Sequence, residues 1–207
     1  MTFRLLLIAA LVLATAAFAQ NPITADSPFQ VRYASNLNAG DSVINITNTG
    51  ARGAGLQAGT TASITGSLCV SAYAFSPDEQ MIACCSCPVT PNGLRSLSAQ
   101  DFIGHIRFGG PSSFVVKLLA SIPVGGSCAG SAASPGSLAQ GMAAWGTTLH
   151  AAPGGGYQVT ETSFIPATLS DGELSRLTNH CMFILANGSG YGICKSCRLG
   201  GLGGARR

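Results

Sequence analysis

Short stretches of alternating apolar and polar residues occur along this chain, and their period of two predicts β-strands. In residues 42–48, Ile44 and Ile46 fall on one face between polar neighbours. Residues 68–75 are apolar on both faces, which is typical of a central strand covered from two sides. Further strands are predicted at 29–33, 81–85, 94–98, 142–150 and 157–164, and at 114–122, which is a long run of β-branched and aliphatic residues.

Turn-forming residues separate these strands. The run SPDE at 76–79 has proline at the second position of a type I turn, and PNG at 91–93 is a second strong turn signal. Short strands joined by such turns are typical of antiparallel sheets. We therefore expect a mostly β fold, an antiparallel β-sandwich or barrel-like domain, with 68–75 and 114–122 as inner strands.

One segment near the C-terminus has helical periodicity instead. The apolar residues on one face of this expected helix are Leu174, Leu177, Cys181 and Ile184. Ser170 and Glu173 fit a capping box, in which Ser170 caps the first turn and Glu173 reaches back. Asn187 and Gly188 supply a stop signal. The expected fold therefore includes one C-terminal helix, with Cys181 facing the sheet.

The first nineteen residues predict a signal peptide. Arg4 supplies the early positive charge, residues 5–13 form an apolar run, and Ala17 and Ala19 place small residues before a cleavage point at Gln20. No later apolar stretch is long enough to span a bilayer. We therefore expect an exported protein, extracellular or periplasmic, without a membrane span once residues 1–19 are removed.

Composition favours one secreted domain with few charged residues. Charged residues make up 9% of the chain, against roughly 25% in typical globular proteins. Several of the basic residues lie in the last thirteen positions: Lys195, Arg198, Arg206 and Arg207. Nucleic-acid binding through a basic face is therefore disfavoured. We expect a single β-rich domain over 20–198 and a flexible, glycine-rich basic tail over 199–207.

The cysteines predict a disulfide framework. The eight are Cys69, Cys84, Cys85, Cys87, Cys128, Cys181, Cys194 and Cys197. An even set in an exported chain favours four disulfides, although eight cysteines allow 105 pairings. We expect Cys84 and Cys85 to face opposite sides of their strand and to find different partners. Cys69 lies one hairpin away from both and could pair there, whereas Cys181 should pair with the sheet or with the C-terminal segment.

Two other uses of the cysteines stay open. The runs 84–87 and 194–197 each contain the spacing C-x-x-C, so together they could form a Cys₄ zinc site. Export makes this less favoured, because exported thiols oxidise. A redox-active dithiol at 194–197 is less favoured still, because the motif follows a helix rather than beginning one. We therefore predict no metal and no cofactor.

Motifs for catalysis are absent from the sequence. His105, His150 and His180 are scattered, and no G-x-S-x-G elbow occurs. Glu161 is the only acid inside a predicted strand, and one carboxylate does not make a glycosidase pair. The single tryptophan, Trp145, is expected to pack in the core rather than to serve as a platform for a sugar. The alternative is a secreted hydrolase in which one histidine meets a serine or carboxylate that distant parts of the chain supply.

Two cysteine-containing segments carry a family resemblance. The run CCSCPVTPNGL at 84–94, within 69–97, and the run GICKSC at 192–197 resemble segments of a group of uncharacterised exported bacterial proteins. That group has no assigned activity. The resemblance therefore implies export and a disulfide framework, and it implies nothing about a substrate.

The sequence as a whole favours a secreted structural, surface or binding module without a catalytic site. Its low charge and small side chains suit packing against other surface proteins or a cell-envelope polymer.

Overall fold

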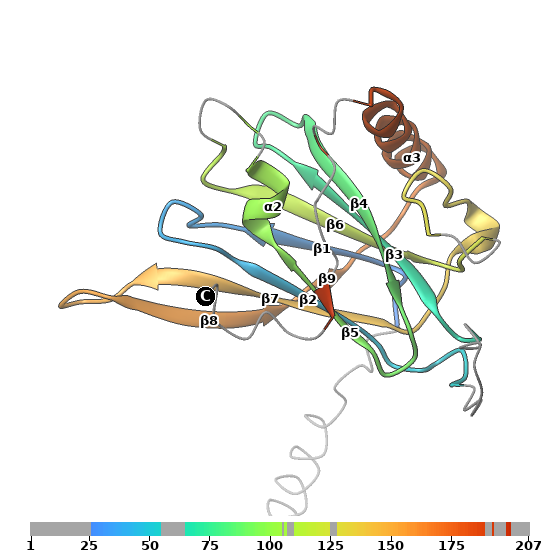
Figure 1. The fold of residues 1–207 in the computed structure, drawn as a ribbon, viewed down its shortest axis with the longest axis horizontal. Coiled ribbons are helices and arrows are strands. Elements are labelled where there is room, and N and C mark those ends of the chain that lie inside the picture. The colour runs from blue at the N-terminus through green and yellow to red at the C-terminus, as the bar shows by residue number, and fades with distance from the viewer. Residues whose placement is uncertain are drawn as a thin grey trace, which may run out of the picture.

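Two antiparallel five-stranded sheets form the protein, as Figure 1 shows. This computed structural model describes residues 26–54, 65–104, 106, 110–124, 128–188, 192 and 198–199. The predicted signal peptide, residues 1–19, lies outside the described residues. The expected mostly β fold with a C-terminal helix is confirmed.

The strand order places sequence-distant segments side by side. The first sheet has the order β4-β3-β6-β1-β9, with β1 (Phe29–Ala34), β3 (Leu68–Phe75), β4 (Met81–Val89), β6 (Phe114–Ser121) and β9 (Ile165–Pro166). The second has the order β10-β5-β2-β7-β8, with β2 (Val43–Asn48), β5 (Leu94–Ser98), β7 (Met142–Ala151), β8 (Tyr157–Ser163) and β10 (Arg198–Leu199). All eight predicted strands are present. Leu199, the first residue of the predicted tail, lies in β10, and 200–207 lie outside the described residues.

The main apolar core lies between the two sheets. Its largest fully buried side chains include Phe102, Phe114, Ile44, Ile46, Leu68, Leu97 and Leu118. Phe102 comes from the short helix α2 (Ala99–Ile103), which the sequence pattern did not predict. The centroids of the Phe102 and Phe114 rings are 5.7 Å apart. The alternating apolar residues of β2 and β5 thus meet those of β3 and β6.

A second apolar cluster covers the outer face of the first sheet. Helix α3 (Asp171–Ala186) buries Leu174, Leu177 and Cys181 against Tyr73 and Leu119. Every residue of β3 is therefore buried, as its two-sided apolar pattern predicts.

The start of α3 differs from the predicted capping box in one respect. The Ser170 hydroxyl accepts the Glu173 backbone N–H at 3.2 Å, as expected. The Glu173 carboxylate instead pairs with Lys117 of β6, with 2.6 Å between Nζ and Oε1. The tertiary partner offers a full positive charge, which attracts a carboxylate more strongly than the backbone amide does.

Two disulfides link these elements covalently. Cys84–Cys181 joins β4 to α3, and Cys69–Cys128 joins β3 to the segment before β7. Cys84 faces the helix whereas Cys85 lies in the core between the sheets, so the prediction that these neighbours face opposite sides is confirmed.

The expectation that Cys69 could pair across the hairpin is wrong. The register of β3 with β4 sets Cys69 opposite Pro88 and Cys84 opposite Tyr73. Cys69 and Cys84 are thus separated by four positions along the ladder, about 13 Å at the usual rise per residue. A disulfide cannot span that distance.

Cys85 and Cys87 are disulfide-bonded as well. We expect their partners among Cys194 and Cys197, because disulfides between the first cysteine cluster and the C-terminal segment would tie the end of the chain to the early hairpin; Cys194 and Cys197 lie outside the described residues. Gly192, just before that segment, accepts the backbone N–H of Cys84 at 2.7 Å through its carbonyl oxygen.

Alkaline pH should weaken the fold through Tyr73. Its hydroxyl donates to the Gly130 carbonyl at 2.7 Å, and burial raises its pKa from 10.0 to about 12. The folded state therefore holds the proton more tightly, so stability is intact below pH 10 and falls between pH 10 and 12, by up to about 3 kcal/mol. Urea unfolding at pH 9 and pH 11 checks this, with Tyr73→Phe as the comparison. Equal losses in the two proteins would contradict the assignment.

Candidate functional site

The β7–β8 hairpin projects from the sandwich, as the orange strands in Figure 1 show. Its tip contains Gly154, Gly155 and Gly156, whose φ angles are +90°, +97° and +82°. L-residues rarely adopt these angles, so the glycines let the chain reverse there. The projecting part carries its two strands beyond the cover of the first sheet.

Strand β8 is exposed along its whole length. Burial alternates on β7, where Ala144, Gly146 and Thr148 face inward, but all seven residues of β8 are exposed. Tyr157 and Val159 expose 61% and 60% of their surface. Within the described residues β8 pairs with β7 alone, so it forms an edge of the second sheet.

The hydrogen bonds between β7 and β8 show which backbone groups of β8 point away from β7. The N–H of Phe164 donates to Ala144 O at 2.9 Å, and the N–H of Ala152 donates to Gly156 O at 3.1 Å. These pairs share the register of β7 with β8, in which hydrogen-bonded pairs alternate with open ones. The backbones of Gln158, Thr160 and Thr162 therefore face β7. Those of Tyr157, Val159, Glu161 and Ser163 face away from it.

The other three sheet edges in the described structure are protected. Strand β4 contains Pro88 and is contacted by Gly192, β9 is two residues long and ends in Pro166, and β10 is also two residues long. Prolines, short strands and covering segments are the usual ways to prevent strand addition at an edge. Strand β8 has no proline, lysine or register shift.

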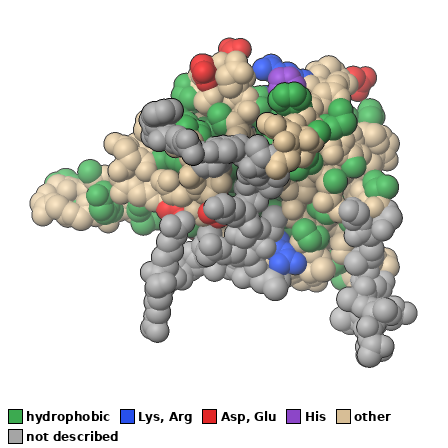
Figure 2. All heavy atoms as spheres, turned by 45° about the horizontal axis from the view of Figure 1, so that its top comes forward, with side chains coloured by type: hydrophobic (Ala, Val, Ile, Leu, Met, Phe, Trp, Pro, Cys, Tyr) green, Lys and Arg blue, Asp and Glu red, His purple; other side chains and the backbone are tan. Residues whose placement is uncertain are grey.

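The visible surface of the hairpin agrees with this picture. In Figure 2 the projecting part shows hydrophobic and uncharged polar side chains and no basic ones. Glu161 is the single charged residue of β8. Charge therefore offers little resistance to an approaching strand.

A buried arginine lies behind the hairpin. Arg32 of β1 is only 6% exposed and points between the sheets. Its Nη2 donates to Gly146 O at 2.9 Å and to Thr148 Oγ1 at 2.8 Å, and its Nε donates to Thr162 Oγ1 at 3.2 Å. A Cβ at Gly146 would lie 2.7 Å from Nη1, so a side chain at this position would displace the guanidinium from its present place. The guanidinium thus links β1 to both β7 and β8 by hydrogen bonds.

The positive charge of Arg32 is uncompensated within the described residues. No salt bridge to Arg32 is found there, and its buried Nη1 has no hydrogen-bond partner. Burial accordingly lowers the pKa of the guanidinium. The three bonds that Arg32 makes orient the hairpin, while its desolvated charge opposes folding.

Arg32→Met should therefore leave the free energy of unfolding unchanged or higher. The apolar side chain fills similar space and removes a buried charge with an unpaired N–H. Arg32→Lys keeps the charge but cannot make all three bonds, and we expect it to cost about 2 kcal/mol. Urea unfolding of both variants tests this, and a larger loss for Met than for Lys would refute it.

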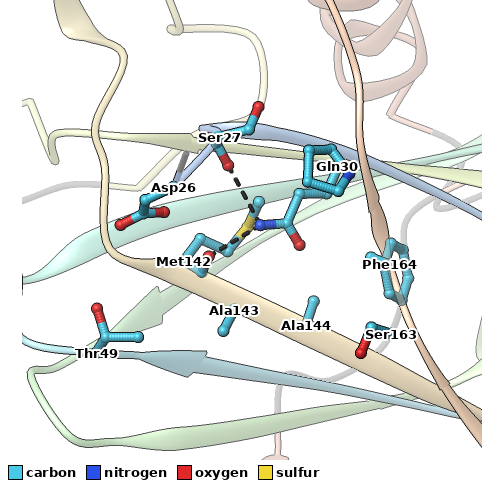
Figure 3. Close-up of a pocket in the computed structure, with 10 residues that line it drawn as sticks. Asp26, Ser27, Gln30, Thr49, Met142, Ala143, Ala144, Ser163 and Phe164 are labelled. Atoms are coloured by element: carbon cyan, nitrogen blue, oxygen red, sulfur yellow. Dashed lines mark hydrogen bonds between the residues drawn. The ribbon is translucent and has the colours of Figure 1, made fainter. Parts of the chain in front are cut away.

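A pocket of about 330 Å³ lies beside Gln30, where β7 begins and β8 ends (Figure 3). The Gln30 amide spans its wall, donating to Met142 O at 2.9 Å and to Ser27 O at 3.2 Å. Asp26 Oδ2 accepts the Gly141 N–H at 2.6 Å. The lining includes the Asp26 carboxylate and the Ser27 hydroxyl, but that hydroxyl donates to Phe29 O at 2.8 Å, and no hydrogen bond joins it to Asp26 among the described residues.

The described histidines do not form a catalytic group. His150 Nε2 lies 2.9 Å from Thr160 Oγ1 on the exposed hairpin, so its partner is neither a serine nor a carboxylate. His180 lies on the surface of α3, beside a pocket that Gln80 and Phe183 also line. His105 lies outside the described residues. The hydrolase alternative thus gains no support in the described part of the chain.

Trp145 does not pack in the core as expected. It is half-buried on β7, between Ala144 and Gly146, whose positions face inward. The strand alternation therefore turns the indole to the outer face of the second sheet.

A zinc site is also unsupported. No group of three or more potential metal ligands occurs among the described residues. Cys85 and Cys87 are disulfide-bonded, so they cannot supply the thiolates that a Cys₄ site needs.

The described helices include none that is both long and apolar enough to cross a membrane. No protein-family model, curated protein or solved structure matches the chain. The geometry of its own residues therefore has to support any functional assignment.

Proposed function

We propose that this protein is an exported, non-catalytic binding module that acts by strand addition at β8. The observation that carries the proposal is the edge itself. Among the described strands, β8 alone combines full exposure, a length of seven residues and no protecting proline or bulge. Natural proteins protect edges of this kind unless the edge is used.

Export is supported by two independent features. Residues 1–19 have the charge, apolar run and small residues of a signal peptide. The structure contains Cys69–Cys128 and Cys84–Cys181, and disulfides persist mainly in oxidising compartments. An exported module meets its partner outside the cytoplasm.

The chemistry of the edge favours a protein partner over a polysaccharide. An extended peptide satisfies outward N–H and C=O groups at the spacing of a β-ladder, and those main-chain bonds supply the affinity. Exposed Tyr157 and Val159 then contact alternate side chains of the added strand. Other surface proteins are therefore the proposed partners.

An NMR titration with a blocked, uncharged threonine–valine heptapeptide tests this function. We expect the amide signals of Val159 and Glu161 to shift, because their N–H groups point away from β7. Glu161→Pro removes one outward N–H without touching the ladder to β7 and should abolish the response. Glu161→Ala keeps that N–H and is the matched control. Shifts that are absent from β8, or that survive in the proline variant, would refute strand addition.

A further inference from the structure

We infer that the strand occupying the β8 edge is β8 of a second copy, paired antiparallel about Thr160. This inference rests on the proposed function, because it names the partner of the same edge. It predicts a symmetric dimer in which the second sheets of two copies join into one continuous sheet.

Backbone groups of β8 alternately face β7 and point away from it, and this alternation limits the registers in which β8 of a second copy can pair. Only the outward-facing residues Tyr157, Val159, Glu161 and Ser163 can exchange main-chain bonds with an added strand. With the two-fold axis at Thr160, Val159 lies opposite Glu161 of the second copy and Tyr157 lies opposite Ser163. All four outward residues then find a hydrogen-bonding position, and the whole of β8 is used.

Neighbouring registers are less favourable for physical reasons. An axis at Glu161 sets the two Glu161 side chains directly opposite each other, which is a like-charge clash. An axis at Val159 pairs Gly155 and Gly156 with the end of the partner strand. Their φ angles of +97° and +82° belong to the turn and not to an extended strand. The Thr160 axis avoids both problems.

The side chains are self-complementary in the Thr160 register. On one face Val159 meets the aliphatic part of Glu161, and Tyr157 meets Ser163. On the other face Thr160 meets its own equivalent, and Gln158 meets Thr162. Cross-strand threonine pairs are favourable in antiparallel sheets. Because β8 carries no basic residue and one acid, its two copies approach with little net repulsion.

Such a contact is small, so the dimer should be weak. A pair of seven-residue strands buries less than the roughly 1,200 Å² at the lower end of stable interfaces. We therefore expect a monomer–dimer equilibrium that depends on concentration. The β7–β8 hairpin extends away from the sandwich (Figure 1), which leaves its tip end apart from the other strands.

Cysteine cross-linking of the exported protein, with its native disulfides intact, tests the register. In the proposed dimer the two residues at position 160 form an open pair with Cα atoms about 4.5 Å apart, which a disulfide can bridge. Thr160→Cys should form a covalent dimer under mild oxidation. Gln158→Cys is the matched control, because the two copies of position 158 are separated by four residues along the ladder, about 13 Å. We expect cross-linking at least tenfold faster for Thr160→Cys.

Sedimentation velocity supplies an independent measurement without added cysteines. The wild type and Glu161→Ala should dimerise with rising concentration, and Glu161→Pro should stay monomeric. Equal cross-linking of the two cysteine variants, or faster cross-linking of Gln158→Cys, would overturn the register. A monomeric wild type that still binds the heptapeptide would overturn self-pairing while leaving the proposed function intact. A monomer that does not bind the peptide would overturn both.

Discussion

Val116→Asp is expected to prevent secretion of folded protein. Val116 is fully buried in the core, on β6 between β1 and β3, where it pairs with Arg32 and Ala74. An aspartate there would bring a second charge into a closely packed interior, opposite Arg32. Its desolvation costs several kcal/mol, which attraction to a guanidinium already bonded to β7 and β8 repays only in part. Since whole domains have only about 5–15 kcal/mol of stability, the loss is large enough to unfold the protein. The yield from the medium and the melting temperature measure it.

The same exchange at an exposed strand position is the control. Val159 of β8 is 60% exposed, so Val159→Asp should be secreted normally and melt near the wild-type temperature. An unchanged yield and melting temperature for Val116→Asp would show that β6 does not lie between two layers. The two-sheet description of the core would then be wrong.

Reduction of the disulfides should destabilise the fold strongly, whereas a metal chelator should have no effect. Cys84–Cys181 closes a loop with a sequence separation of 97 residues, and Cys69–Cys128 one of 59. Loops of this size correspond to about 4 kcal/mol each in the chain-entropy model. Unfolding with and without reductant measures the total. The double variant Cys84→Ala/Cys181→Ala isolates the bond between β4 and α3.

Mass mapping of the oxidised protein extends this prediction to the remaining cysteines. Cys85 and Cys87 are disulfide-bonded, and Cys194 and Cys197 complete the set of eight. We expect peptides containing 85–87 to be linked to peptides containing 194–197. Four free thiols with one bound zinc per chain, or unfolding by EDTA, would restore the Cys₄ alternative.

Local periodicity predicted most of the secondary structure because burial in this fold follows the strand and helix periods. Leu68–Phe75 is apolar on both faces because α3 covers one face and the second sheet the other. Ser170 caps α3 as its side-chain chemistry requires. The elements that the pattern missed, such as α2, β9 and β10, are too short to show a period.

The candidate site could not be found in this way, because it depends on contacts between distant segments. In β1 the apolar residues Phe29 and Val31 pack toward α3, so the polar Gln30 and Arg32 face the second sheet and are buried. Simple alternation would place Arg32 in solvent. Likewise, nothing within residues 157–163 indicates that β8 lies at an edge, because the strand order is set by long-range pairing. The signal that could have pointed there is the glycine-rich turn, which marks a hairpin but not its exposure.

Hydrogen exchange along β8 is the most direct test of the open edge. In dilute protein with its disulfides intact, the amides of Gln158, Thr160 and Thr162 should be protected by β7, and those of Val159 and Glu161 should exchange freely. Higher protein concentration or the heptapeptide should then slow Val159 and Glu161 selectively. If these two amides are already protected in the dilute monomer, or stay unprotected under every condition, β8 is not a site of strand addition.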